Sequence, residues 1–248
     1  MKQGTFNAVL ILIAFTIGFI VFFVIFGNAP KDSILHEMYQ GGPLISVLIA
    51  MSIMVVTYIV ERLLSLKKAN GTASQEKFLA DVIKNLNDDN FDGAIKNCDK
   101  QRSSLANILK KSISRYTEVT NLKGFTKKER IEEVKRVLEE TTMLEMPILE
   151  RNLIALSTIA SIATLVGLLG TVIGMIRSFA ALARAGSPDA TALSKGISEA
   201  LFNTAGGIGI AIFAIVAYNF FTTKIDGMTY LIDESGKDVV RNLEAKHE

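Results

Sequence analysis

Hydroxyl side chains recur at helical spacing inside a long uncharged segment of this 248-residue chain. Residues three, four or seven positions apart share one face of a helix, so these hydroxyls form a single stripe. A hydroxyl both donates and accepts hydrogen bonds, and it therefore suits a polar path for a group that alternates between protonated and charged forms. Serine and threonine in such helices also bond to their own backbone carbonyls, which is the simpler interpretation. The four residues are Ser157, Ser161, Thr164 and Thr171.

A second apolar segment, 197–221, carries one hydroxyl on its small-residue face, Thr204, and one carboxylate near its start, Glu199. A carboxylate close to membrane depth is a candidate functional group. The alternative is an interfacial ion pair. Its possible cations are Arg177, Arg184 and Lys195. Neither segment has a carboxylate near its middle, so if protons cross here we expect a partner to supply the titrating group.

Other chemistries lack the residues that they need. The single cysteine, Cys98, cannot form a disulfide within the chain, and two histidines, His36 and His247, are too few for a multi-histidine metal site. The sequence has no recognisable set of nucleophile and base and no metal-ligand spacing, so it indicates neither an enzyme nor a bound cofactor or metal. The net charge of +2 gives no indication of nucleic-acid binding.

Hydrophobic residues make up 49% of the chain and the mean hydropathy is positive, which indicates a membrane protein with a polar insert. We predict an all-α integral membrane protein with four transmembrane helices, because about 20 apolar residues span the hydrocarbon core. The first could instead be a signal peptide, but its 19 uncharged residues exceed the usual apolar region of about 7–15. The predicted spans are 8–26, 43–60, 152–176 and 197–221.

Lysine and arginine concentrate on one side of these spans. Segment 61–151 holds 18 of the 27, whereas the chain before the first span and the loop after it hold one each. Because these residues are retained in the cytoplasm, we predict that both termini and 61–151 are cytoplasmic. The predicted domains are an N-terminal transmembrane helix with its outer loop (1–42), a second span (43–60), a helical cytoplasmic domain (61–151), a transmembrane helix pair (152–223) and a cytoplasmic tail (224–248).

The cytoplasmic domain is expected to be helical. Ser74, Ser103 and Thr126 each precede apolar residues at helical spacing, so we expect helices to begin at them, with a turn at 90–93 leading into a short helix. We expect Cys98 on that short helix to be a small core residue. Glycine is absent from 125–166, which predicts one long helix that continues from the cytoplasm into the third span, kinked or loosened by Pro147.

Small residues form a further stripe on each of the last two spans. Small side chains let helix backbones approach closely, which is how helices associate in lipid. We therefore predict that these stripes are helix contacts that support an oligomer, with Gly167, Gly170, Gly174 and Gly207 as packing residues. The stripe on the third span is Ala160, Ala163, Gly167, Gly170 and Gly174, and that on the fourth is Ala200, Thr204, Gly207, Ala211 and Ala214.

Three segments resemble the MotA/TolQ/ExbB family of proton-channel proteins. Residues 166–176 with 178–179 are similar to the signature GLLGTVxGMIxxF, and 197–220 resemble IxEALxxTAxGLxxAIPAxxxYNxF. Residues 42–62 resemble the family's first helix and its charged exit. Together these segments cover most of the last three spans, and their motifs are closest to ExbB. The cytoplasmic domain is similar only in length and helical character.

The resemblance implies a homopentamer of this chain around two copies of a single-helix ExbD-type partner that supplies the membrane aspartate. It further implies that protons drive rotation of that partner in the bacterial inner membrane, and that a TonB-like protein carries the work to outer-membrane transport. In the family, the threonines that match Thr171 and Thr204 face the channel, and the glutamate that matches Glu199 is also implicated in the channel. The predicted proton pathway comprises Thr171, Thr204, Glu199, Ser157, Ser161 and Thr164.

The chain departs from the family at three points. Two family prolines are replaced by Thr164 and Phe213, so both helices should be straighter there. The extra N-terminal span is a MotA feature, whereas ExbB and TolQ commonly have three spans; we give the motifs more weight than the count. A TolQ-like or MotA-like stator subunit remains an alternative, as does a non-conducting membrane scaffold, which should tolerate valine at both Thr171 and Thr204.

Overall fold

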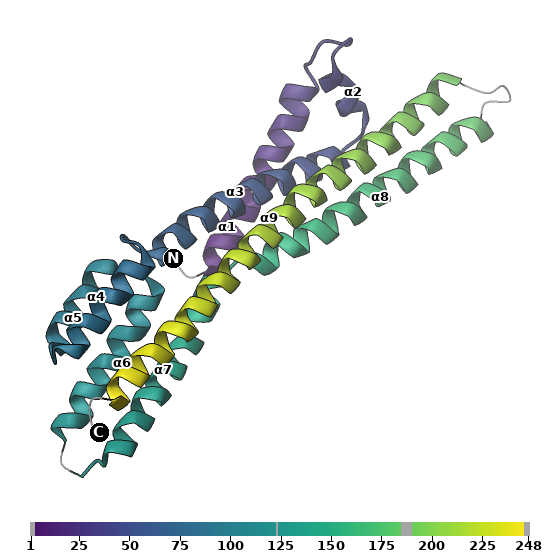
Figure 1. Cartoon of the computed structure of the whole chain (residues 1–248). Helices are drawn as coiled ribbons and strands as arrows, with labels where there is room; N and C mark the ends of the chain where they lie inside the picture. Colours follow the sequence, from purple (N-terminus) through teal and green to yellow (C-terminus); the bar gives the residue numbers. More distant parts are fainter. Residues whose placement is uncertain (1–2, 123, 185–189, 246–248) are drawn as a thin grey trace. The chain divides into compact units, whose positions relative to one another are not determined.

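The computed structural model describes residues 3–122, 124–184 and 190–245, and every regular element within them is helical (Figure 1). Four of the described helical segments are long and apolar enough to cross a membrane, which confirms the predicted all-α fold with four spans. The elements are α1 (Gln3–Ile20), the π-helix η1 (Val21–Phe26), α2 (Ile34–Gln40), α3 (Leu44–Asn70), α4 (Gln75–Asn87), α5 (Phe91–Gln101), α6 (Ser104–Asn121), α7 (Lys127–Leu149), α8 (Leu153–Arg184) and α9 (Ala190–Ala245).

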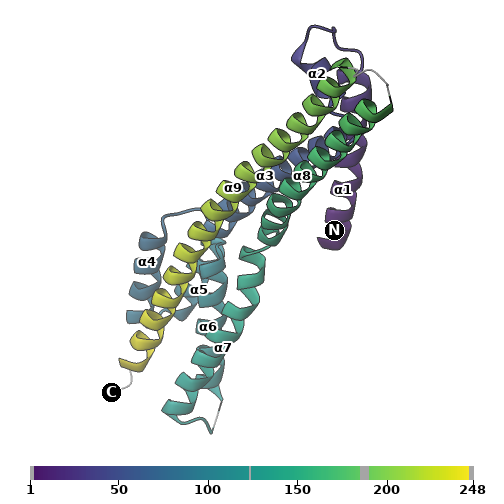
Figure 2. The ribbon, with the colours of Figure 1, turned by 90° about the vertical axis from the view of Figure 1, so that its right-hand side faces the viewer.

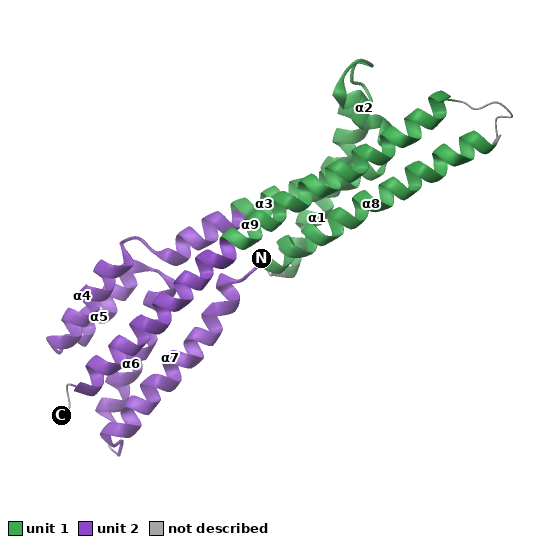
Figure 3. Ribbon diagram, turned by 45° about the vertical axis from the view of Figure 1, so that its right-hand side comes forward, with its two compact units in different colours: residues 1–60, 152–220 green, residues 61–151, 221–248 purple. Residues whose placement is uncertain are grey.

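The chain forms two compact units (Figure 3). Unit 1 comprises residues 1–60 and 152–220, and unit 2 comprises 61–151 and 221–248. Helices α3 and α9 each contribute residues to both units, because they continue well past the predicted ends of their apolar segments. Unit 1 therefore contains the apolar parts of the chain, and unit 2 contains most of its charges.

In unit 1, helix α1 packs through every fourth residue. An added Cβ on Gly18 would lie 2.7 Å from the carbonyl oxygen of Ser46 and 3.1 Å from the amide nitrogen of Ala50, so α1 and α3 approach backbone to backbone. Farther along, Phe22 and Phe26 of η1 form a buried cluster with Ile45 and Leu48 of α3. The buried row on α1 and η1 consists of Leu10, Ala14, Gly18, Phe22 and Phe26.

Helices α8 and α9 lie side by side in unit 1, as both Figure 1 and Figure 2 show. Both are regular α-helices through Thr164 and Phe213, the positions of the two missing prolines. Helix α9 is described from Ala190, seven residues before the predicted start of the fourth span. A short helix that the sequence did not indicate, α2, begins at its cap residue Ser33 and precedes α3.

Helix α7 continues through Pro147, but the predicted long helix is interrupted at residues 150–152, just after the proline that we expect to kink or loosen it. Helix α7 ends at Leu149, and α8 begins only after Asn152, whose φ of +62° is a left-handed conformation that asparagine tolerates better than most residues. In a continuous helix the Leu149 carbonyl would accept from the amide of Leu153. Instead it accepts a 3.0 Å hydrogen bond from the Arg62 guanidinium, which satisfies the end of α7.

The helices of unit 2 begin where the sequence predicts. The hydroxyls of Ser74 and Ser103 accept from backbone amides three residues on, and Thr126 forms a reciprocal capping box with Glu129. Asn90 caps α5 in the same way, so this helix begins at Phe91, within the segment 90–93 that was predicted to be a turn. Most side chains in the interior of unit 2 are apolar. Cys98 is only 3% exposed there, which confirms that it is a core residue. Its burial raises the pKa of the thiol to about 12.

Candidate functional site

The α8–α9 contact in unit 1 is built on glycine. An added Cβ on Gly167 would lie 2.9 Å from the carbonyl oxygen of Asn203, and one on Gly174 would lie 2.7 Å from that of Gly196, both closer than real Cβ atoms approach. Gly207 faces the Gly167 backbone, and Gly170 faces the Asn203 side chain. These glycines therefore lie where α8 and α9 of the same chain meet, and they let the two backbones approach closely within the subunit.

Two hydroxyls meet at this contact. Thr171 of α8 and Thr204 of α9, both half-buried, are hydrogen-bonded to each other through their Oγ1 atoms. Each also lies within reach of a carbonyl in its own helix, Thr171 at 3.3 Å from Gly167 O and Thr204 at 3.2 Å from Ala200 O. Each threonine therefore keeps an acceptor for its proton when the pair opens, and its oxygen is then free to accept from another group.

The other three predicted hydroxyls line a groove of about 640 Å³ between α8 and α9. Ser157, Ser161 and Thr164 contribute from α8, and Tyr218 and Asn219 contribute from α9. Each of the three hydroxyls donates to a carbonyl of its own helix, at 3.1–3.2 Å, as the simpler interpretation of such residues expects. Their oxygens retain lone pairs that face an open, partly polar groove. The groove and the Thr171–Thr204 pair are separate contacts on the same two helices.

Glu199 lies nine residues into α9, farther along the helix than the sequence predicted. It is only 8% exposed, and its carboxylate forms an ion pair with Arg177 of α8. Of the three cations considered, Arg177 is thus the partner that the structure identifies; the side chain of Arg184 lies outside the described part of the chain. The structure therefore has the ion pair that the sequence offers as one alternative, and a carboxylate this deeply buried stays a candidate functional group.

Sequence reasoning missed Asn203, which is fully buried between Glu199 and the hydroxyl pair. Its Nδ2 donates to the carbonyl of Gly41 at 2.7 Å and to that of Glu199 at 2.9 Å. Its Oδ1 is buried and has no hydrogen-bond partner among the described residues. An asparagine next to Thr204 in an uncharged segment is the signal that was available, because such a side chain must find partners inside the membrane protein.

The charged exit of α3 is a buried structural contact in unit 2. Arg62 is 0% exposed, and its Nε and Nη2 each donate a 2.7 Å hydrogen bond to the Glu61 carboxylate. Together with its bond to the Leu149 carbonyl, this gives the guanidinium a defined partner on three of its nitrogens. Arg62 therefore connects α3 to the end of α7.

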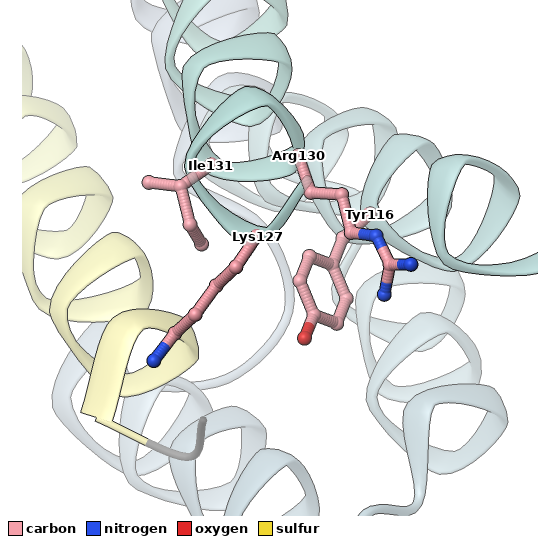
Figure 4. A pocket seen from close by; sticks show the side chains of 4 residues that line it. All are labelled: Tyr116, Lys127, Arg130 and Ile131. Atoms are coloured by element: carbon pink, nitrogen blue, oxygen red, sulfur yellow. The ribbon is translucent and has the colours of Figure 1, made fainter. Parts of the chain in front are cut away.

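A hollow of about 250 Å³ between α6 and α7 carries two cations, Lys127 and Arg130 (Figure 4). In that view their side chains extend to opposite sides of the Tyr116 ring, so they do not converge on one point. Burial raises the pKa of Tyr116, which keeps the phenol neutral. Among the described residues no group of His, Cys, Asp or Glu could hold a metal ion, and His247 lies outside them.

Residues 100–234 match the MotA/TolQ/ExbB proton channel family, which covers more than half of the chain and includes α8 and most of α9. The chain belongs to this family. The family is described as one of proton channels, and the four apolar helices agree with a multi-pass membrane protein.

Individual relatives in this family agree with the ExbB resemblance. An ExbB-like biopolymer transport protein of Synechocystis sp. is 32% identical over 198 residues, or 78% of this chain and 87% of the relative. Biopolymer transport protein ExbB of Pseudomonas putida is 39% identical over 34% of this chain and 26% of its own length. The Tol-Pal system protein TolQ of Pseudomonas aeruginosa is 32% identical over 49% of this chain and 53% of its own.

Proposed function

We propose that this chain is the proton-conducting subunit of an ExbB-type membrane motor, which uses the proton gradient to energise a TonB-like transducer for outer-membrane transport. The observation that carries the proposal is the Thr171–Thr204 hydroxyl pair at the glycine-packed contact of α8 and α9. An acidic group that moves through an apolar interior must be met by donors and acceptors, since an unpaired polar group there costs several kcal/mol. A pair whose members each have a second acceptor meets that requirement.

In this proposal the pathway follows the α8–α9 helix pair. It begins at Glu199, passes the threonine pair and ends at the groove lined by Ser157, Ser161 and Thr164. The uncharged middle of α8 and α9 supplies no titrating group, which supports a partner that brings its own carboxylate. We take that partner to be an ExbD-like single helix, with two copies inside a homopentamer of this chain.

The proposed location is the bacterial inner membrane, with both termini and 61–151 in the cytoplasm. The distribution of lysine and arginine supports this orientation. One elementary charge that crosses 100 mV releases about 2.3 kcal/mol, so several protons per step would supply enough free energy for a large movement of the partner. The work would leave the membrane through the transducer on the opposite side from segment 61–151.

The test replaces both threonines by valine and measures gradient-driven uptake in cells that express each variant at equal levels. Valine keeps the shape of threonine and removes its hydroxyl, so Thr171→Val with Thr204→Val should abolish uptake while leaving folding and partner binding intact. The paired serine variant retains both hydroxyls and should retain uptake. Thr158→Val is the matched control, because Thr158 is an exposed α8 hydroxyl that bonds only to Ile154 and lies outside the groove lining.

A non-conducting scaffold is the second candidate. The observation that favours it is the bonding of the groove hydroxyls to their own helix, which needs no transported group. A scaffold that uses α8 and α9 only for packing would tolerate the double valine change. Wild-type uptake in that variant would therefore refute the pathway and favour the scaffold. If the chain is instead a TolQ-like or MotA-like stator, the double valine variant should also lose proton flow, but the process that the protein drives would be a different one.

A further inference from the structure

The turn before α3 lies directly against the Glu199 ion pair. Gly42 adopts a φ of +77°, and a Cβ added there would collide with the Glu199 carboxylate and lie 3.5 Å from the Arg177 guanidinium. The backbone conformation favours glycine, and the missing side chain leaves room for the Glu199 carboxylate. The arrangement explains why the Glu199 side chain is only 11% exposed while that of Arg177 is 54% exposed. The turn covers the carboxylate.

One side chain connects this turn to the helix that carries Glu199. The Nδ2 group of Asn203 reaches the Gly41 carbonyl, 162 residues away in the sequence, and also the Glu199 carbonyl one turn earlier in α9. The buried Oδ1 has no partner within the described residues and therefore costs free energy. A leucine would fill the same space without that cost. The presence of an amide here is therefore best explained by the two hydrogen bonds that its N–H groups donate to the carbonyls of Gly41 and Glu199.

From this geometry we infer that Asn203 is a positioning residue for Glu199. It holds the 41–42 turn on the ion pair, keeps the carboxylate buried, and closes the end of the pathway at which Glu199 lies. The importance of this positioning for transport rests on the proposed function, whereas the contact itself can be tested without a transport assay. The family motif IxEALxxTA leaves this position, between the glutamate and the threonine, unspecified.

The experiment measures how fast Glu199 reacts with a water-soluble carbodiimide and an amine in the purified full-length protein. Peptide mass spectrometry gives the extent of modification at each carboxylate. Glu37, an exposed residue of α2, is the internal reference in the same sample. Asn203→Leu removes the bond that holds the turn at similar volume, and the loss of one such bond should raise the Glu199 rate relative to Glu37 by about five-fold.

Two further variants make the result decisive. Gly42→Ala leaves Asn203 intact but places a methyl group where the Glu199 carboxylate lies, so the carboxylate and the turn must separate and the Glu199 rate should also rise. Thr16→Val, which removes a hydroxyl bonded within α1, should leave the rate unchanged. If Asn203→Leu does not fold, the smaller change Asn203→Ala, which also removes the bond to Gly41, takes its place. A Glu199 rate that stays at the wild-type value in the folded variants overturns the inference, whatever their transport. Faster labelling together with normal uptake in the double valine variant upholds the inference and refutes the proposed function.

Discussion

Gly167 is the position at which the α8–α9 contact can be tested most directly. A methyl group there would lie 2.9 Å from the Asn203 carbonyl oxygen, 3.2 Å from the Gly207 Cα and 3.3 Å from the Thr204 Cα. All three atoms belong to the backbone of α9, so no side-chain rotation can relieve the clash. Gly167→Ala must therefore move the two helices apart, and the Thr171–Thr204 hydroxyl pair lies one turn away.

The expected magnitude follows from two opposing effects. Alanine is preferred over glycine in a helix interior by about 1 kcal/mol, and overpacking a tight contact costs roughly 1–3 kcal/mol. Gly209 offers the matched control, because a Cβ added there meets nothing within 4 Å. Gly209→Ala should therefore show only the helical gain. Gly167→Ala should be about 1–3 kcal/mol less stable than Gly209→Ala, a difference in which the helix-propensity contribution cancels.

The assay is reversible unfolding of each purified variant in mixed detergent micelles, followed by far-ultraviolet circular dichroism because the chain has no tryptophan. Uptake measured in parallel should fall for Gly167→Ala and stay normal for Gly209→Ala, since only the first displaces the threonines. Equal unfolding free energies for the two alanine variants would refute the close approach of α8 and α9 at Gly167.

Two further predictions concern unit 2. Arg62→Met should destabilise the protein by roughly 3 kcal/mol in the same unfolding assay, because it removes three hydrogen bonds made by a fully buried guanidinium. Lys67→Met, an exposed change on the same helix, should have almost no effect, and equal losses for the two would contradict the role of Arg62. Cys98, whose pKa is raised from 9.0 to about 12, should have about a thousand-fold smaller thiolate fraction at pH 8 than an ordinary thiol. It should therefore react with a maleimide only after unfolding, and rapid labelling of the folded protein would disprove its burial.

Local chemistry made much of the fold predictable. The four apolar segments and the caps at Ser74, Ser103 and Thr126 depend only on nearby residues, and the structure has them at those positions. Helix ends were harder to predict. The second predicted span ends at residue 60, before the charged Glu61, but a helix that leaves an apolar segment keeps its backbone hydrogen bonds, so α3 continues to Asn70.

Three features could not be predicted from the sequence because they depend on residues that are distant along the chain. The break between α7 and α8 uses Arg62, which lies 87 positions from the carbonyl that it binds. Asn203 interacts with Gly41 across 162 positions and belongs to no periodic stripe. Likewise, Thr171 and Thr204 were singled out on separate helices, but their mutual hydrogen bond depends on the register of α8 against α9, which one sequence does not specify.

The buried row of α1 also determines how freely that helix can vary. Residues spaced by four form a ridge that is inclined to the helix axis, so α1 meets its neighbours along one narrow line. The π-helical turn keeps Phe22 and Phe26 on this line, because bonds from i to i+5 place more residues in each turn. Most other apolar side chains of α1, such as Leu12 and Ile13, are exposed in this chain and would face lipid. Exchange of one apolar residue for another should therefore be tolerated at most positions of α1 and η1 except the five of the buried row, of which Gly18 is the least replaceable.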